Sequence, residues 1–164
     1  MMKKWVVYDS AYGNTEQIAW AIGSAFSSAE DVVVVRASEV KVEQLSEVKL
    51  LVVGSPTQKF RPLAGITNFL QSIPPNGLRG IKVVAFDTRL QESEIEKNRI
   101  LVFFVKLFGY AAKPISNRLV KKGGELIAPP EGFYVKGMEG PLQEGELERA
   151  IAWAKHIMKL ASTL

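Results

Sequence analysis

The residues best suited to hold a ligand lie between Ser10 and Thr15, directly after a short apolar run. The side chains of Ser10, Asn14 and Thr15 supply hydroxyl and amide donors, and Gly13 lets the backbone approach a ligand closely. Apolar residues then recur at helical spacing, so the loop ends at a helix N-terminus, where free N–H groups and the helix dipole favour an anion. The stretch predicts a phosphate-holding loop. A plain helix corner capped by Asn14 or Thr15 is the alternative.

Composition excludes several kinds of catalytic site. The 164 residues include no cysteine and one histidine, His156, which excludes disulfides, thiolate metal sites, cysteine nucleophiles and multi-histidine metal sites. No Gly-x-Ser-x-Gly motif supports a serine triad, and His156 has no orienting partner in the sequence. The glycine-rich motifs of dinucleotide and triphosphate loops are also absent from the sequence.

Charge and hydropathy indicate a soluble globular protein, with 47% hydrophobic and 23% charged residues. The sequence has neither an apolar run of about 18 residues nor a signal-peptide core, so we expect a cytoplasmic protein with one domain over residues 1–164. The net charge of +4 is compatible with nucleic acid, an anionic membrane surface or an acidic protein partner. The basic residues are not gathered in a tail, which argues against a nucleic-acid-binding arm.

Four apolar runs have the pattern of strands covered on both faces, because polar residues do not alternate within them. These runs are Trp5–Tyr8, Asp31–Arg36, Lys49–Gly54 and Ile81–Phe86. Helical periodicity is found over Pro62–Ile73, over Ala111–Lys122 and from Gln143 onward. Strands that alternate with helices predict βαβ units and a parallel sheet with right-handed crossovers.

The first loop and its flanks resemble the N-terminal signature of the flavodoxin family. Every signature position is filled, by Val6, Val7, Tyr8, Ser10, Gly13, Thr15, Ala19 and Ile22. Tyr12 stands where many members have threonine, so a backbone N–H replaces one hydroxyl contact to phosphate. Gly54–Thr57 and Phe86–Arg89 resemble the second and third loops, and residues 126–135 resemble a split last strand.

The resemblance implies a flavodoxin-like α/β fold: a doubly wound five-stranded parallel sheet of order 2-1-3-4-5 with helices on both faces. It implies FMN as the cofactor, with the phosphate held by Ser10, Ala11, Tyr12, Gly13, Asn14 and Thr15. The flavin ring is then bordered by Pro56, Thr57, Gln58, Lys59 and Phe60, and its pyrimidine edge by Asp87, Thr88 and Arg89. Backbone groups of Thr57 and Gln58 are expected at N5 of the ring. A turn or cap role for Asp87 and a solvated role for Arg89 are the alternatives.

The function implied by the resemblance is a carrier of one or two electrons between redox partner proteins. In that case the cofactor supplies the chemistry, and no side chain acts as acid, base or nucleophile. Two alternatives share the scaffold: an FMN-dependent oxidoreductase, such as a quinone reductase or a protoporphyrinogen oxidase-like protein, and a cofactor-free binding scaffold.

Two further features concern partners. The strongly apolar stretch Ile100–Tyr110 is predicted to be an inserted, partly exposed element that forms a homodimer or partner contact, with an ordinary core helix as the alternative.

Between Lys49 and Leu90 the only acid is Asp87, whereas the basic residues are Lys49, Lys59, Arg61, Arg79, Lys82 and Arg89. We expect this basic face to dock an acidic partner. We also expect Lys59 and Arg89 to make the second one-electron reduction potential less negative than in acidic flavodoxins.

Overall fold

The computed structural model describes residues 2–26, 31–91 and 98–163. Its centre is a parallel sheet in which strands follow the order β2-β1-β3-β4-β5, while β6 also pairs with β4. The strands are β1 (Lys4–Tyr8), β2 (Val32–Arg36), β3 (Leu50–Pro56), β4 (Lys82–Leu90), β5 (Glu125–Leu126) and β6 (Glu131–Val135). The predicted order 2-1-3-4-5 is therefore confirmed, and two short segments share the fifth position.

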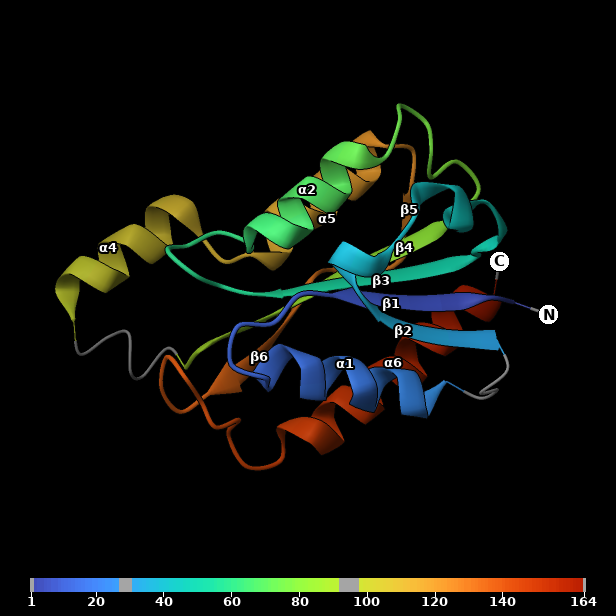
Figure 1. The fold of residues 1–164 in the computed structure, drawn as a ribbon. Coiled ribbons are helices and arrows are strands. Elements are labelled where there is room, and N and C mark those ends of the chain that lie inside the picture. The colour runs from blue at the N-terminus through green and yellow to red at the C-terminus, as the bar shows by residue number, and fades with distance from the viewer. Residues whose placement is uncertain (1, 27–30, 92–97, 164) are drawn as a thin grey trace.

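Helices cover both faces of the sheet, as predicted (Figure 1). The helices α1 (Asn14–Ala25) and α6 (Glu146–Ser162) lie on one face, and α2 (Ala64–Ser72) and α5 (Ala112–Lys121) lie on the other. Two 3₁₀ helices, η2 (Ala37–Glu39) and η3 (Val42–Glu47), occupy the connection between β2 and β3. The carboxyl ends of the parallel strands β1, β3 and β4 lie together at one edge of the sheet, which these helices do not cover.

Successive residues of each inner strand point to opposite faces, which divides the core in two. Val7, Leu51 and Val83 pack under α2 and α5. Val6, Leu50 and Val84 pack under α1 and α6. This double burial is the reason why the inner strands are apolar at consecutive positions.

The valine-rich strand β2 departs from its prediction as a fully buried strand. It begins at Val32 rather than Asp31, and among the described strands it pairs with β1 alone, so it is an edge of the sheet. Val33 is 37% exposed, and the other residues of β2 are partly exposed. An edge strand lacks a second neighbour, and a run of β-branched residues does not reveal this.

The stretch predicted to be an insertion forms a further helix, α4 (Arg99–Phe108). Figure 1 shows α4 projecting from the carboxyl edge of the sheet, away from the layer formed by α2 and α5. Ile100 is 67% exposed and Phe103 is 61% exposed, so these two side chains are not part of a core. Gly109, with φ 72°, follows α4 and lets the chain turn toward α5.

Candidate functional site

A cavity of about 390 Å³ lies at the carboxyl edge of the sheet. Of the fourteen residues that the sequence predicts for the site, all except Gly13 and Asp87 line this cavity. Five lining residues were not predicted: Leu90, Val105, Tyr110, Val135 and Met138. Leu90 ends the third loop, Val105 and Tyr110 lie in the stretch predicted to be a partner contact, and Val135 ends the predicted last strand. Met138 lies beyond that strand, in a segment for which the sequence predicts no ligand role.

The first loop presents backbone N–H groups at the start of α1. Gly13 is the N-cap residue, with φ 90°, and neither Asn14 nor Thr15 caps the helix through its side chain. The hydroxyl of Ser10 accepts the N–H of Gly13 at 3.0 Å and that of Glu16 at 3.4 Å. Among the residues that the structure describes, the amides of Ala11, Tyr12, Asn14 and Thr15 donate to no protein acceptor. Such a group of unbonded amides at a helix N-terminus is suited to an anion.

Side chains of this loop also connect it to its neighbours. The hydroxyl of Thr15 is hydrogen-bonded to that of Thr88 at 2.8 Å. The Nδ2 group of Asn14 donates to the carbonyl of Glu139 at 3.2 Å, which holds the turn before Pro141 against the loop. The first loop is thereby fixed to the third loop and to the turn that follows β6.

The second loop contains a tight two-residue turn. Gln58 and Arg61 exchange backbone hydrogen bonds of 3.0 and 2.9 Å around Lys59, with φ 48°, and Phe60, with φ 64°. Two-residue hairpin turns with positive φ at both positions favour Asn-Gly, so this backbone conformation costs energy in residues with side chains. The turn places both Lys59 and Phe60 at the cavity.

Thr57 is held by two hydrogen bonds. Its N–H donates to the carbonyl of Thr88 at 2.9 Å, and its hydroxyl accepts the N–H of Ala111 at 3.1 Å. The N–H of Gln58 is bonded within the turn. Both of these backbone N–H groups are thus engaged, and the carbonyl of Thr57 has no donor among the described residues. This carbonyl is an acceptor that the hydrogen bonds of the second loop leave unused.

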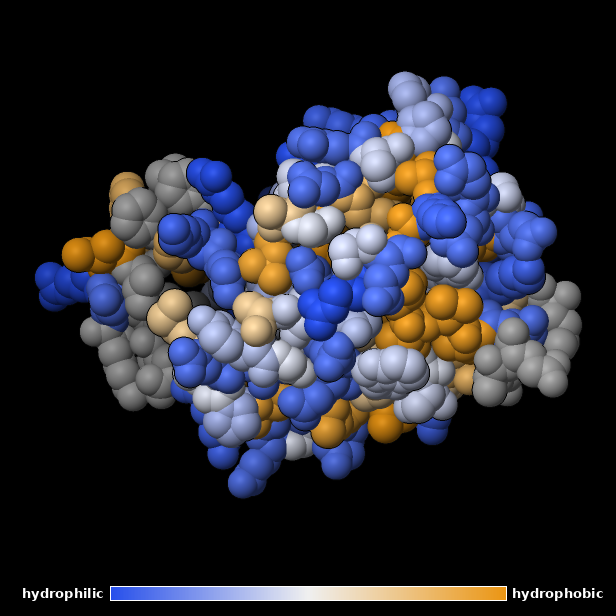
Figure 2. All heavy atoms as spheres, viewed as in Figure 1, coloured by the Kyte–Doolittle hydropathy of each residue, from blue (hydrophilic) through white to orange (hydrophobic). Residues whose placement is uncertain are grey.

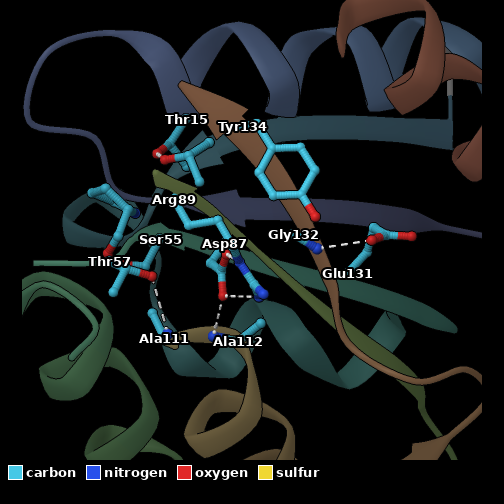
Figure 3. Close-up of polar contacts among 12 residues, drawn as sticks. Thr15, Ser55, Thr57, Asp87, Arg89, Ala111, Ala112, Glu131, Gly132 and Tyr134 are labelled. Carbon is cyan, nitrogen blue, oxygen red and sulfur yellow. Dashed lines mark hydrogen bonds and ion pairs between the residues drawn. The ribbon is translucent and has the colours of Figure 1, made fainter. Parts of the chain in front are cut away.

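The carboxylate of Asp87 is fully buried and faces α5 rather than the cavity. It accepts two bonds from Arg89, at 2.6 and 2.7 Å, and one of 2.9 Å from the N–H of Ala112 at the start of α5 (Figure 3). The guanidinium of Arg89 lies 3.7 Å from the centre of the Tyr110 ring. The side chain of Asp87 therefore has the role of helix cap and ion-pair partner.

This ion pair changes the electrostatics predicted for the site. Arg89 lines the cavity, but it is paired with the buried carboxylate of Asp87 and is not the solvated cation of the alternative interpretation, and its predicted effect on the reduction potential stays a prediction. Lys59 is exposed and forms no ion pair within the described ranges, and no acidic side chain of these ranges lines the cavity. Lys59 is consequently the cation through which the described part of the chain acts on a ligand in this cavity.

Burial raises the pKa of Asp87, although hydrogen bonds from Arg89 and from the N–H of Ala112 act to lower it. Burial acts to lower the pKa of Arg89, but the hydrogen bond and the charge of Asp87 raise it above its ordinary value. An acid whose pKa is raised by folding binds more protons in the folded state than in the unfolded state. Its contribution to stability therefore decreases as the pH rises above about 4, the range of an unfolded aspartate.

Arg89→Gln should destabilise the protein by about 3–5 kcal/mol at pH 7, because it leaves the buried carboxylate of Asp87 without its cation. The loss should become smaller as the pH falls, since protonation of Asp87 removes the unpaired charge. Urea unfolding between pH 5 and pH 8 measures both effects. Asp87→Asn in the Arg89→Gln background should restore part of the stability at pH 7. A cost for Arg89→Gln that does not change with pH would contradict this account of the pair.

Comparison with known proteins shows which family has this sequence pattern and which solved structures have a similar fold. The sequence model described as flavodoxin matches residues 6–153, whereas no curated protein sequence matches the chain. A solved flavodoxin from the domain Archaea is similar at 23% identity and a TM-score of 0.69, covering 98% of this chain and 99% of its own. Flavodoxin 2 from Bacillus cereus is similar at 21% identity and a TM-score of 0.73, covering 96% and 98%.

A larger protein contains the same fold. Rubredoxin:oxygen oxidoreductase from Desulfovibrio gigas is similar at 21% identity and a TM-score of 0.71, over 98% of this chain but only 36% of its own. At these identities the solved structures establish the fold, whereas the sequence model covers most of the chain and establishes the family. The chain belongs to the flavodoxin family.

Proposed function

We propose that the protein binds FMN in the cavity at the carboxyl edge and carries one or two electrons between redox partner proteins. FMN is the cofactor of the flavodoxin family, and it supplies the redox chemistry when bound. The observation that carries the proposal is the set of unbonded amides at the start of α1, which opens on a cavity with an apolar wall. The chain itself contributes binding, orientation and charge.

The residues of the cavity fit such a cofactor. The free N–H groups of the first loop and the hydroxyl of Thr15 suit a phosphate. Phe60, Leu90 and Val135 provide apolar surface for an aromatic ring. The carbonyl of Thr57 provides an acceptor for a ring N–H, which favours a protonated ring nitrogen over a bare one.

An FMN-dependent oxidoreductase remains the second candidate. The similarity to part of the Desulfovibrio gigas oxidoreductase shows that this fold also occurs within larger enzymes. Direct oxidation of NAD(P)H by the FMN-loaded protein distinguishes an oxidoreductase from a carrier, which needs a protein partner. Failure to take up FMN would indicate a cofactor-free scaffold.

An acidic protein is the proposed partner, and its docking would involve only some of the basic residues between Lys49 and Leu90, because these residues do not share one face. Lys49, Arg79 and Lys82 lie near the amino ends of β3 and β4, at the edge opposite the cavity. Lys59 and Arg61 lie beside the cavity and are exposed. The basic face predicted from the span between Lys49 and Leu90 is thus divided between two ends of the sheet. No helix among the described residues is long and apolar enough to cross a membrane.

Helix α4 is the proposed site of a homodimer or partner contact. Ile100 and Phe103 are both exposed, and Figure 2 shows apolar surface at the outer end of this helix. Val105, from the same helix, lines the cofactor cavity. A protein bound to α4 would consequently lie beside the cofactor.

Thr15→Ala should weaken FMN binding about tenfold, because it removes a hydroxyl that can donate a charge-assisted hydrogen bond to phosphate. Riboflavin, which lacks the phosphate, should bind far more weakly than FMN. Flavin fluorescence titration measures both affinities. Ser24→Ala, which removes an exposed hydroxyl from the last turns of the same helix, is the control and should leave the affinity unchanged. Equal affinities for riboflavin and FMN would contradict a phosphate site at this loop.

Lys59→Gln should make the second one-electron reduction potential more negative by tens of millivolts. A unit charge about 8 Å from the ring at an effective dielectric near 20 contributes about 2 kcal/mol, and the exposure of Lys59 reduces this value. Spectroelectrochemistry of the FMN-loaded protein measures the potential. Lys121→Gln, a distant exposed change on α5, is the control for net charge. An unchanged potential in Lys59→Gln would show that this cation does not tune the flavin.

Replacing Ile100 and Phe103 together by serine should abolish self-association, if α4 is a contact between two copies. Wild-type protein should then sediment faster as its concentration rises, and the double variant should sediment as a monomer throughout. Val120→Ser tests an exposed apolar residue on α5 and should behave as wild type. A wild-type protein that is monomeric at every concentration would exclude the homodimer and leave the partner contact.

A further inference from the structure

A second cavity, of about 610 Å³, lies between α2 and α5 beside the cofactor cavity. We call it the basic cavity, because the charged side chains that line it among the described residues are Lys59, Arg61 and Arg118. These cations come from the second loop and from α5, so segments far apart in the sequence bring them together. The cavity does not belong to the cofactor site, with which it shares only Lys59 and Phe60.

The interior of the basic cavity is apolar. Pro62 and Pro114, which are partly exposed, provide the accessible apolar surface of its wall. Leu70 from α2 and Ile115 from α5 also belong to the lining, but they are buried, with 1% and 0% exposed. A ligand that reaches this wall must carry an apolar body, because a fully hydrated ion gains nothing from such a surface.

The rim of the basic cavity is positively charged, in contrast to its apolar interior. None of its three cations forms an ion pair with a described acidic residue, and no aspartate or glutamate lies among the lining residues. The hydroxyl of Thr67, also in the lining, has no hydrogen-bond partner among the described residues. Three unpaired cations around one hollow repel each other, and an anion bound between them relieves this repulsion.

We propose that the basic cavity binds a small organic anion that has an apolar body and at least two negative groups. The apolar body lies against Pro62 and Pro114, and the negative groups pair with Arg61, Arg118 and Lys59. An acidic face of a protein would pair with the same cations, but it needs no cavity of this size and leaves the apolar wall uncovered. The hollow together with its apolar wall therefore favours a small molecule.

The basic cavity and the cofactor cavity are separated by a single turn. Lys59 and Phe60 form the strained turn between the two cavities and line both. A ligand in the basic cavity therefore contacts the same turn that borders the cofactor cavity. The binding site itself is independent of the proposed FMN function, since Arg61, Arg118 and Leu70 do not line the cofactor cavity.

Titration of naphthalene-1,5-disulfonate into the full-length, FMN-loaded protein tests the proposal, with isothermal titration calorimetry as the readout. The disulfonate should bind, and naphthalene-1,5-diol, which has the same body without the charges, should bind at least about tenfold more weakly. Arg61→Gln and Arg118→Gln should each weaken disulfonate binding about fivefold. Lys121→Gln removes the same charge from the same helix outside the cavity and should change the affinity less than twofold.

Three results would overturn the proposal. Equal binding of the diol would show an apolar cleft without anion recognition. An equal effect of Lys121→Gln and Arg118→Gln would show nonspecific attraction to a basic surface. Binding of a poly-glutamate peptide that depends on Arg118, without binding of the disulfonate, would assign the cations to an acidic protein. FMN titration of the Arg61 and Arg118 variants should give wild-type affinity, so loss of the disulfonate site and failure to bind FMN are distinguishable.

Discussion

The buried carboxylate of Asp87 is the constraint on which the cofactor edge of the molecule depends. A charge without solvent must have its partners inside the protein, and the partners of Asp87 are Arg89 and the N–H of Ala112 at the start of α5. Through Arg89 the pair also reaches the ring of Tyr110. One side chain thus fixes the end of β4 relative to the start of α5 and to one wall of the cavity.

The other two loops are joined to this centre by short polar links. The hydroxyls of Thr15 and Thr88 bond to each other, and Thr57 bonds to both Thr88 and Ala111. These links satisfy several of the polar groups near the strand ends. Among the described residues that line the cavity, the groups without a protein partner include the amides of the first loop and the carbonyl of Thr57. The polar groups that a ligand can use at this site are therefore largely those that the hydrogen bonds of the fold do not use.

The turn at Lys59 and Phe60 separates two cavities of different character. The cofactor cavity has an anion site at its loop and apolar walls, whereas the basic cavity has cations around an apolar interior. Both turn residues hold a backbone conformation that costs energy, which is common where a segment is shaped for a ligand. The same two residues therefore border both cavities.

The sequence by itself determined which segments become strands and helices, because burial on both faces requires consecutive apolar residues in each inner strand. The alternation of elements predicts a parallel sheet, and the resemblance to the flavodoxin signature implies the loop at Ser10–Thr15 and the order of the sheet. The exposure of β2 and the direction in which α4 projects could not be predicted from the pattern of apolar residues, although the order 2-1-3-4-5 places β2 at an edge and Ile100–Tyr110 was predicted to be partly exposed. They depend on which neighbours a segment lacks, and hydrophobicity alone does not show this.

Only the tertiary structure decided which charges act at the site. Asp87 and Arg89 are two residues apart on one strand, where side chains share a face, but their pairing required the buried start of α5 beside them. Lys49 and Lys82 are close to the cavity loops in sequence, yet they begin strands whose other ends carry those loops. The effect of a charge falls with distance through space and with solvent screening, so residue types and spacing along the chain cannot assign it.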